Sequence, residues 1–202
     1  SARGTVLLGH GAGGGVESAD LQALAELSQH GWCVVLIEQP WRVAGRRIAV
    51  APAKLDEAAS DILDALSGDP HPLPRPWVLG GRSAGARVAC RLADRAQALV
   101  LIAFPLQPPG PRGRGGLAPS RIGELLLPVR GGIPVLVLQG VRDRFGGPEE
   151  ILSALATAGE PTQEHDGAAA PVSVRPYPGD HAPSHDPGPL VADTLAFLNA
   201  LP

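Results

Sequence analysis

Short apolar runs alternate with longer segments of helical pattern along the 202-residue chain. Between the apolar runs, leucines recur at helical spacing, as at Leu21, Leu24 and Leu27. Most of the runs are apolar throughout, which is typical of strands that are covered on both faces. The alternation predicts an α/β fold with one mostly parallel sheet of about six strands and helices on both faces. The expected strands are residues 4–8, 32–37, 77–80, 98–102, 134–138 and 172–175.

The length and the 44% hydrophobic content predict a single domain over residues 1–202. Two connections, 39–52 and 104–120, are too rich in Pro, Gly and Arg for regular structure, so we expect surface loops near the site. A third, 159–171, is expected to be a solvent-exposed excursion. The segment between Ile102 and Pro134 has no long insertion, which predicts that a large lid domain is absent.

The overall charge and hydropathy narrow the range of partners. A net charge of -3 gives no general attraction to nucleic acid or anionic membranes, so we expect neither as a partner. No apolar stretch approaches the roughly 18 residues of a membrane span, and no signal peptide is visible, so we expect a cytoplasmic protein. The expected oligomeric state is a monomer or a homodimer. Cys33 and Cys90 lack zinc-site or C-x-x-C spacing and are expected to be buried free thiols.

The segment Gly81-Arg82-Ser83-Ala84-Gly85 stands where an expected strand gives way to an expected helix. This G-x-S-x-G pattern in that context is typical of a nucleophile elbow, in which a serine sits on a strained turn and glycines leave room for the neighbouring chain. The same pentapeptide also occurs in ordinary turns, and the chain has 26 glycines. Its context favours Ser83 as a catalytic nucleophile.

A serine hydroxyl needs a base to take its proton, and the base needs an acid to orient it. In α/β-hydrolases these groups follow in the order Ser, Asp or Glu, His. Asp143 comes soon after the fifth expected strand, and His181 follows the sixth, so both fit that order. Asp143 could instead cap a turn, and His185 is a rival for the histidine. A metal site at His181 and His185 is disfavoured because Pro183 breaks the helix that would align them.

The first expected strand ends in a glycine-rich segment, Gly9-His10-Gly11-Ala12-Gly13-Gly14-Gly15. Backbone N–H groups of Ala12 and Ala84 would form an oxyanion hole. Gly9-x-Gly11-x-x-Gly14 also matches a dinucleotide fingerprint, with Glu38 placed to bind a ribose. Hydride transfer gives no reason for Ser83, Asp143 and His181 to occur in order, so acyl transfer is the preferred interpretation and the dinucleotide binder the weakest.

These motifs resemble the small α/β-hydrolases of the dienelactone-hydrolase-like branch, in the group named after testis-expressed protein and the NSL-complex subunit. The resemblance also rests on residues 80–87, on 104–110, on Gln139-Gly140-Val141-Arg142-Asp143 and on Gly179-Asp180-His181. It implies a triad of Ser83, Asp143 and His181 without a cofactor or metal. In two respects the chain departs from the group: Gln107 stands where a histidine is frequent, and no antiparallel hairpin precedes the first strand.

The resemblance and the motifs together predict a serine hydrolase that cleaves a small ester, thioester or lactone through an acyl-enzyme. The group also contains subunits of assemblies, so a noncatalytic scaffold is the alternative. Residues expected to bind the substrate are His10, Gly13, Trp41, Phe104 and Leu106. Arginines at 42, 46 and 47 suggest an anionic substrate, although loop arginines are usually solvated. Arg82 is expected to form a structural ion pair.

Overall fold

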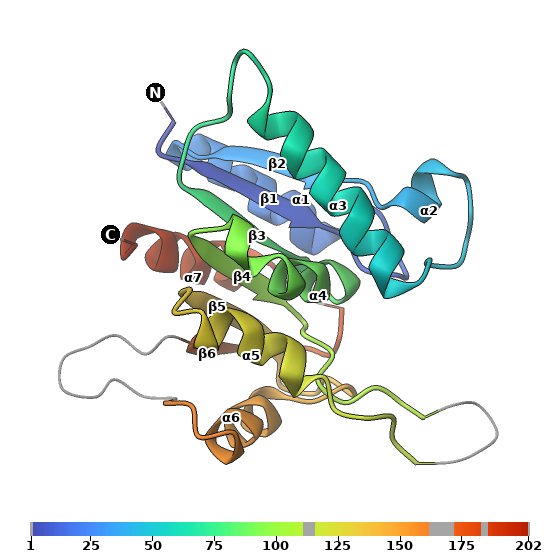
Figure 1. Cartoon of the computed structure of the whole chain (residues 1–202). Coiled ribbons are helices and arrows are strands. Elements are labelled where there is room, and N and C mark those ends of the chain that lie inside the picture. Colours follow the sequence, from blue (N-terminus) through green and yellow to red (C-terminus); the bar gives the residue numbers. More distant parts are fainter. Residues whose placement is uncertain (1, 111–115, 162–171, 183–185, 202) are drawn as a thin grey trace.

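In a computed structural model, the chain forms one six-stranded sheet in which all the neighbouring strands are parallel (Figure 1). The structure describes residues 2–110, 116–161, 172–182 and 186–201. The strand order is β2-β1-β3-β4-β5-β6. The strands are β1 (Thr5–Gly9), β2 (Cys33–Ile37), β3 (Trp77–Arg82), β4 (Ala98–Ile102), β5 (Val135–Gly140) and β6 (Val172–Tyr177).

The six expected strands are confirmed, with ends that shift by one or two residues. The four central strands β1, β3, β4 and β5 are almost wholly buried, because helices cover both faces of the sheet. At one edge, every residue of β2 is only half-buried. Cys33 lies on this edge strand, so the prediction of a buried thiol holds for Cys90 and is wrong for Cys33.

Helices lie between successive strands, and one more follows the last strand. They are α1 (Ala19–Ala25), continued by the 3-10 turn η1 (Glu26–His30), then α2 (Pro40–Val43), α3 (Pro52–Ser67), α4 (Ala84–Arg91) with η2 (Ala93–Arg95), α5 (Ile122–Arg130), α6 (Pro148–Thr157) and α7 (Gly188–Asn199). Proline stands in the first turn of α2, α3, α6 and α7. It is tolerated there because the missing N–H would have no partner within the helix.

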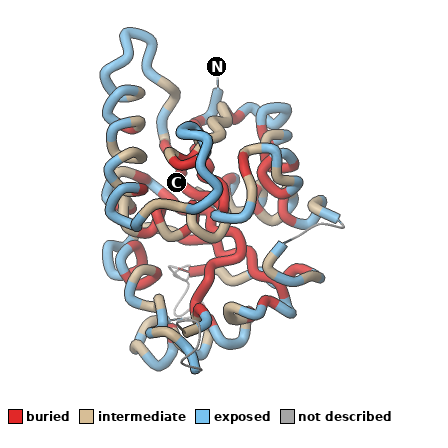
Figure 2. Tube along the Cα trace, turned by 90° about the vertical axis from the view of Figure 1, so that its right-hand side faces the viewer, coloured by how far each residue is buried: buried red, intermediate tan, exposed pale blue. Residues whose placement is uncertain are grey.

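The sheet separates two hydrophobic layers. One layer contains Leu63 of α3, Ala86 and Cys90 of α4, and Leu125 of α5, together with Ile151 of α6. The other contains leucines of α1, η1 and α7. Figure 2 shows the buried chain running through the middle, with exposed segments around it. Burial of these side chains stabilises the fold by roughly 25 cal/mol for each Å² of apolar surface removed from water.

Two expectations about the connections need correction. The segment 39–52 was expected to be irregular, but Pro40–Val43 forms the short helix α2. Helix α5 was not predicted, because Gly123 and Pro128 interrupt its helical pattern. In segment 104–120 the described residues contain no helix or strand, only an isolated bridge between Pro109 and Leu117. Residues 111–115 of that segment, and 162–171 of the expected excursion at 159–171, lie outside the described residues.

No large lid domain is evident in the described residues between β4 and β5, where α5 is the one helix. None of the helices that the structure describes is long and apolar enough to cross a membrane. Since all neighbouring strands are parallel, their carboxyl ends gather at one edge of the sheet, which is where open α/β sheets bind ligands. The predicted triad and oxyanion residues follow β1, β3, β5 and β6 at this edge, and the other predicted substrate-binding residues follow β1, β2 and β4.

Candidate active site

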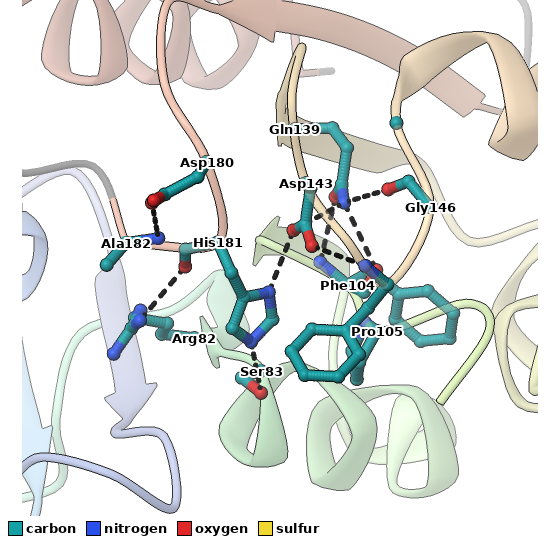
Figure 3. A network of polar contacts seen from close by, with 12 residues as sticks. Arg82, Ser83, Phe104, Pro105, Gln139, Asp143, Gly146, Asp180, His181 and Ala182 are labelled. Atoms are coloured by element: carbon teal, nitrogen blue, oxygen red, sulfur yellow. Dashed lines mark hydrogen bonds and ion pairs between the residues drawn. The ribbon is translucent and has the colours of Figure 1, made fainter. Parts of the chain in front are cut away.

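Ser83 occupies the turn between β3 and α4, in a backbone conformation that side chains rarely adopt. Its φ is 50° and its ψ is -99°. Such a conformation costs on the order of 1–3 kcal/mol and persists only where the surroundings enforce it. Here the backbone N–H of Ser83 donates to the carbonyl of Ile102 at the end of β4, 2.9 Å away. The turn directs the hydroxyl out of the carboxyl edge of the sheet (Figure 3).

The glycines on either side of Ser83 are required by the neighbouring strand β1. Gly81 has a φ of 140°, and a Cβ added there would collide with the carbonyl oxygen of Gly9. A Cβ added at Gly85 would collide with the same oxygen. The expectation that these glycines leave room for an adjacent chain is therefore confirmed, and that chain is the end of β1.

The side chains of Ser83, His181 and Asp143 form one continuous line of hydrogen-bond contacts (Figure 3). His181 Nε2 lies 2.9 Å from Ser83 Oγ, and His181 Nδ1 lies 2.8 Å from Asp143 Oδ2. The three residues come from the ends of β3, β5 and β6, so the sheet brings together positions separated by 98 and 38 residues.

The hydrogen-bond partners assign the histidine tautomer. An ionised carboxylate only accepts, so Nδ1 of His181 carries the proton that Asp143 accepts. The lone pair of Nε2 then faces Ser83 Oγ and accepts its hydroxyl proton. In this arrangement the imidazole can act as a general base toward the serine.

Gln139 of β5 holds the Asp143 carboxylate, a role that was not predicted from the sequence, where Gln139 was noted only as part of a motif. Its side chain is fully buried, and Nε2 donates to Asp143 Oδ2 at 3.0 Å. The same amide group donates to the carbonyl of Gly146, while Oε1 accepts from the N–H of Phe104. Asp143 Oδ1 accepts from the N–H of Phe145 at 2.9 Å. The side chain of Asp143 is thereby fixed by amide donors as well as by the histidine.

Three further contacts position the loop that carries His181. Arg82 forms an ion pair with Asp20 at 3.2 Å, as expected, and also donates to the carbonyl of His181 at 2.9 Å. The Tyr177 hydroxyl donates to the carbonyl of Asp180, and burial raises the pKa of this phenol, which keeps it a donor. The ring of Phe145 packs edge-on against the imidazole, with centroids 4.4 Å apart.

The two predicted oxyanion donors belong to the residue after Ser83 and to the glycine-rich segment after β1. Ala84 is the first residue of α4, and the N–H groups of a first helical turn have no acceptor within the helix. The glycine-rich segment after β1 lies against the nucleophile, since a Cβ added at Gly11 would lie 3.4 Å from Ser83 Cβ. Ala12 follows directly and is exposed. The oxyanion role of both N–H groups stays a prediction.

His10 is fully buried and supports the glycine-rich segment. Its Nδ1 lies 2.8 Å from the carbonyl oxygen of Gly11, and Nε2 accepts from the N–H of Gln39 at 2.9 Å. Its ring also packs edge-on against Trp41, with centroids 5.2 Å apart. These contacts give His10 a structural function, and a direct contact with substrate is not available to it while it is buried.

Phe104 and Leu106 were expected to border the substrate pocket, but their side chains are buried in the core beneath the site. Apolar side chains just after a strand can turn inward, and here the amide of Gln139 holds the backbone of Phe104 in place. Gly13 is exposed and lines an open cleft beside the glycine-rich segment, and Trp41 lines the same cleft although its side chain is almost fully buried. These two remain candidates for binding substrate.

The alternatives of a dinucleotide site and a metal site depend on Glu38 and on the pair His181 and His185. The carboxylate of Glu38, proposed for a ribose, lies 2.7 Å from His10 Nε2 and 3.6 Å from Arg42. His185, the rival histidine and second candidate metal ligand, lies outside the described residues. Within the described residues, no group of three or more His, Cys, Asp or Glu side chains is arranged to hold a metal ion.

Residues 2–165 match the family described as "Alpha/beta hydrolase domain", and the chain belongs to this family. The matched part includes Ser83 and Asp143 and ends before His181. The comparison with curated proteins gave no match.

Similar folds occur among solved structures. The chain is 13% identical to Est1E from Butyrivibrio proteoclasticus, with a TM-score of 0.70 over 99% of this chain and 90% of that one. It is 17% identical to a lidless α/β serine hydrolase from Xanthomonas campestris, with a TM-score of 0.65 over 98% and 83%. A cold-adapted esterase from an Arctic intertidal metagenomic library is 19% identical, with a TM-score of 0.65 over 100% and 83%. At these identities the likeness shows the fold, and the family itself is a hydrolase family.

Proposed function

We propose that the protein is a serine hydrolase that cleaves a small ester, thioester or lactone through an acyl-enzyme. The observation that carries this proposal is the unbroken contact from Asp143 through His181 to Ser83, at 2.8 and 2.9 Å. An esterase and a lidless serine hydrolase among the similar structures lend support. The narrower placement in the testis-expressed and NSL-subunit group rests on the motifs alone.

In the first half of the reaction, Ser83 Oγ attacks the substrate carbonyl carbon while its proton passes to His181 Nε2. The carbonyl oxygen gains negative charge, and the N–H groups of Ala84 and Ala12 stabilise it. Asp143 stabilises the imidazolium that forms. When the tetrahedral intermediate collapses, the bond to the alcohol or thiol breaks and His181 returns the proton to that leaving group.

In the second half, water attacks the acyl-enzyme, giving its proton to His181 Nε2. The bond between Ser83 Oγ and the acyl carbon then breaks, the acid leaves, and the serine regains its proton. The chemistry requires only these side chains, the two N–H groups and water. The strained turn at Ser83 is consistent with this role, since such strain concentrates at active sites.

Labelling with a fluorophosphonate tests the proposal, combined with hydrolysis of esters of increasing acyl length. We expect covalent labelling of the unmodified protein, and loss of both labelling and hydrolysis in Ser83→Ala, with turnover lower by about 10³-fold or more. Ser153→Ala, an exposed serine on α6, is the matched control and should behave as the unmodified protein. Equal labelling of Ser83→Ala would disprove the role of Ser83. If the unmodified protein is folded but is neither labelled nor active, the result favours the noncatalytic scaffold.

A further inference from the structure

A cleft of about 180 Å³ opens beside the predicted oxyanion segment. One wall is formed by residues 12–14, and the other by Trp41 with the arginines at 42, 46 and 47. Gly11 lies against Ser83, and the residues that follow it, 12–14, line this cleft, so the chain connects the nucleophile to the cleft. The arginines come from α2 and the turn after it, which follow β2 at the carboxyl edge of the sheet.

The three arginines differ in how their charges are compensated. Arg42 forms ion pairs with Glu17 at 3.0 Å and with Glu38 at 3.6 Å, which fixes α2 against the segment after β1. Neither Arg46 nor Arg47 has a carboxylate within ion-pair distance among residues 2–110, 116–161, 172–182 and 186–201. Two guanidinium groups without an ion pair among the described residues therefore border the cleft, and Arg46 also lines a neighbouring cleft together with Glu57 and Asp61.

A second cleft, of about 400 Å³, is lined by His181 and is also bordered by arginines. Arg82 is held there by Asp20 and by the carbonyl of His181. The carboxylate of Asp180 lines this cleft together with Arg142 and Arg144, which form no ion pair among the described residues. No carboxylate of the described residues lines the cleft at Arg46 and Arg47, and this difference favours it as the site for an anion.

We propose that the substrate carries an anionic group, a carboxylate or a phosphate, that Arg46 and Arg47 bind in the cleft beside residues 12–14. This inference rests on the proposed hydrolase function and names its substrate class. Guanidinium groups suit this task because their planar N–H donors match carboxylate and phosphate oxygens. The anion anchors one end of the substrate and the scissile carbonyl lies at Ser83, so the binding energy of the anion is used to position the carbonyl.

The test compares each charged substrate with a neutral analogue that lacks the anionic group. Monoethyl adipate carries a carboxylate in its acyl part, and ethyl pentanoate is its neutral analogue. Acetyl-coenzyme A carries phosphates in its leaving group, and the acetyl thioester of N-acetylcysteamine is its neutral analogue. We expect at least one charged substrate to have a kcat/KM about tenfold above its neutral partner. In Arg46→Gln/Arg47→Gln that advantage should vanish through a higher KM, while the neutral substrates react at unchanged rates. Whichever pair shows the effect identifies carboxylate or phosphate as the anion.

Arg95→Gln/Arg130→Gln is the matched control, because it also removes two positive charges. Arg95 and Arg130 come shortly before the starts of β4 and β5, so they lie near the amino edge of the sheet, opposite the proposed site. The control should keep the advantage of the charged substrate. Equal rates for charged and neutral substrates, or equal losses in both double variants, would overturn the inference.

Failure of the proposed function has a separate signature, which is the absence of Ser83-dependent hydrolysis with every substrate. The anion site is then decided by calorimetric titration of monoethyl adipate and of acetyl-coenzyme A into Ser83→Ala protein, which binds without turnover. Binding that is lost when Arg46→Gln and Arg47→Gln are added supports the site. Absence of binding, or binding that survives these changes, rejects it.

Discussion

At the scale of single residues, the site depends on a glutamine as much as on the three side chains of the proposed triad. Asp143 can orient His181 only if its own carboxylate is held, and Gln139 does this while also fixing the turn at Gly146 and the backbone of Phe104. Partners of this kind, one step removed from the reacting groups, are needed to keep a site in its productive geometry.

Replacing Gln139 by leucine should therefore impair catalysis without altering substrate affinity. The change leaves the N–H of Phe104 and the carbonyl of Gly146 without their partner, at a cost of about 1–3 kcal/mol for each group, and removes one of the two hydrogen bonds to Asp143 Oδ2. We expect kcat to fall about 10- to 100-fold at nearly constant KM. Steady-state kinetics and urea unfolding measure the two effects. Gln22→Leu, an exposed glutamine on α1, is the control, and an undiminished kcat in Gln139→Leu would show that Asp143 is held without it.

At the scale of elements, the contact between β1 and the start of α4 determines whether the elbow can form. Gly81, near the end of β3, and Gly85, in α4, both face the carbonyl oxygen of Gly9, so β1 packs closely against the backbone on both sides of the serine turn. A side chain at Gly81 would force β1 away from β3, and one at Gly85 would force it away from α4.

Gly85→Ala tests this contact. Its new methyl group would collide with Gly9, so we expect a loss of about 2 kcal/mol or more in the free energy of unfolding, together with loss of activity. Gly123→Ala is a matched control, because Gly123 is also the second residue of its helix, α5, and nothing lies within 4 Å of the added Cβ. The control should be neutral or slightly stabilising, since alanine favours helix more than glycine does. Equal stability of both variants would refute the steric argument.

Helices α3, α4 and α5 are joined by a cluster of ion pairs. Glu124 accepts two hydrogen bonds from Arg87, both at 2.7 Å, and Arg91 bridges Glu124 to Asp56. Burial by itself would raise the pKa of Glu124, but the hydrogen bonds and the charges of the surrounding arginines outweigh it and hold that pKa below its usual value.

This lowered pKa predicts how stability changes with pH. A carboxyl with a lowered pKa in the folded state contributes stability above its unfolded pKa of about 4.3, and loses it as the pH falls through the folded value. Glu124→Gln should therefore lower the free energy of unfolding by about 1–2 kcal/mol at pH 7, with the partial exposure of the pair limiting the effect. The difference from the unmodified protein should shrink below pH 4 in urea unfolding. A difference independent of pH would contradict the role of this charge.

At the scale of the whole molecule, much of the fold could be predicted from the sequence, because strands covered on both faces are apolar throughout. The fourth strand, 98–102, was predicted to the residue. The G-x-S-x-G pattern pointed to Ser83 and chain order to Asp143 and His181, and the fold brings the three into contact. Local pattern failed where tertiary contacts decide. Helix α5 forms despite Pro128, and Phe104 turns into the core from a loop. The role of Gln139 depends on partners that are distant in sequence, which no local pattern reveals.

The close approach of β1 to the serine turn also limits how such a centre can be inherited or engineered. The residue that crowds Gly81 and Gly85 is Gly9, and the chain continues from it into the segment that borders the nucleophile. The pentapeptide Gly81-Arg82-Ser83-Ala84-Gly85, if transferred alone to another protein, would lack the contacts with β1 that maintain the unfavourable backbone angles of Ser83. A transfer of this site to another protein must therefore include β1 and β3 together with the turns that follow them. A sequence change in one of these turns must be matched by a compensating change in the other.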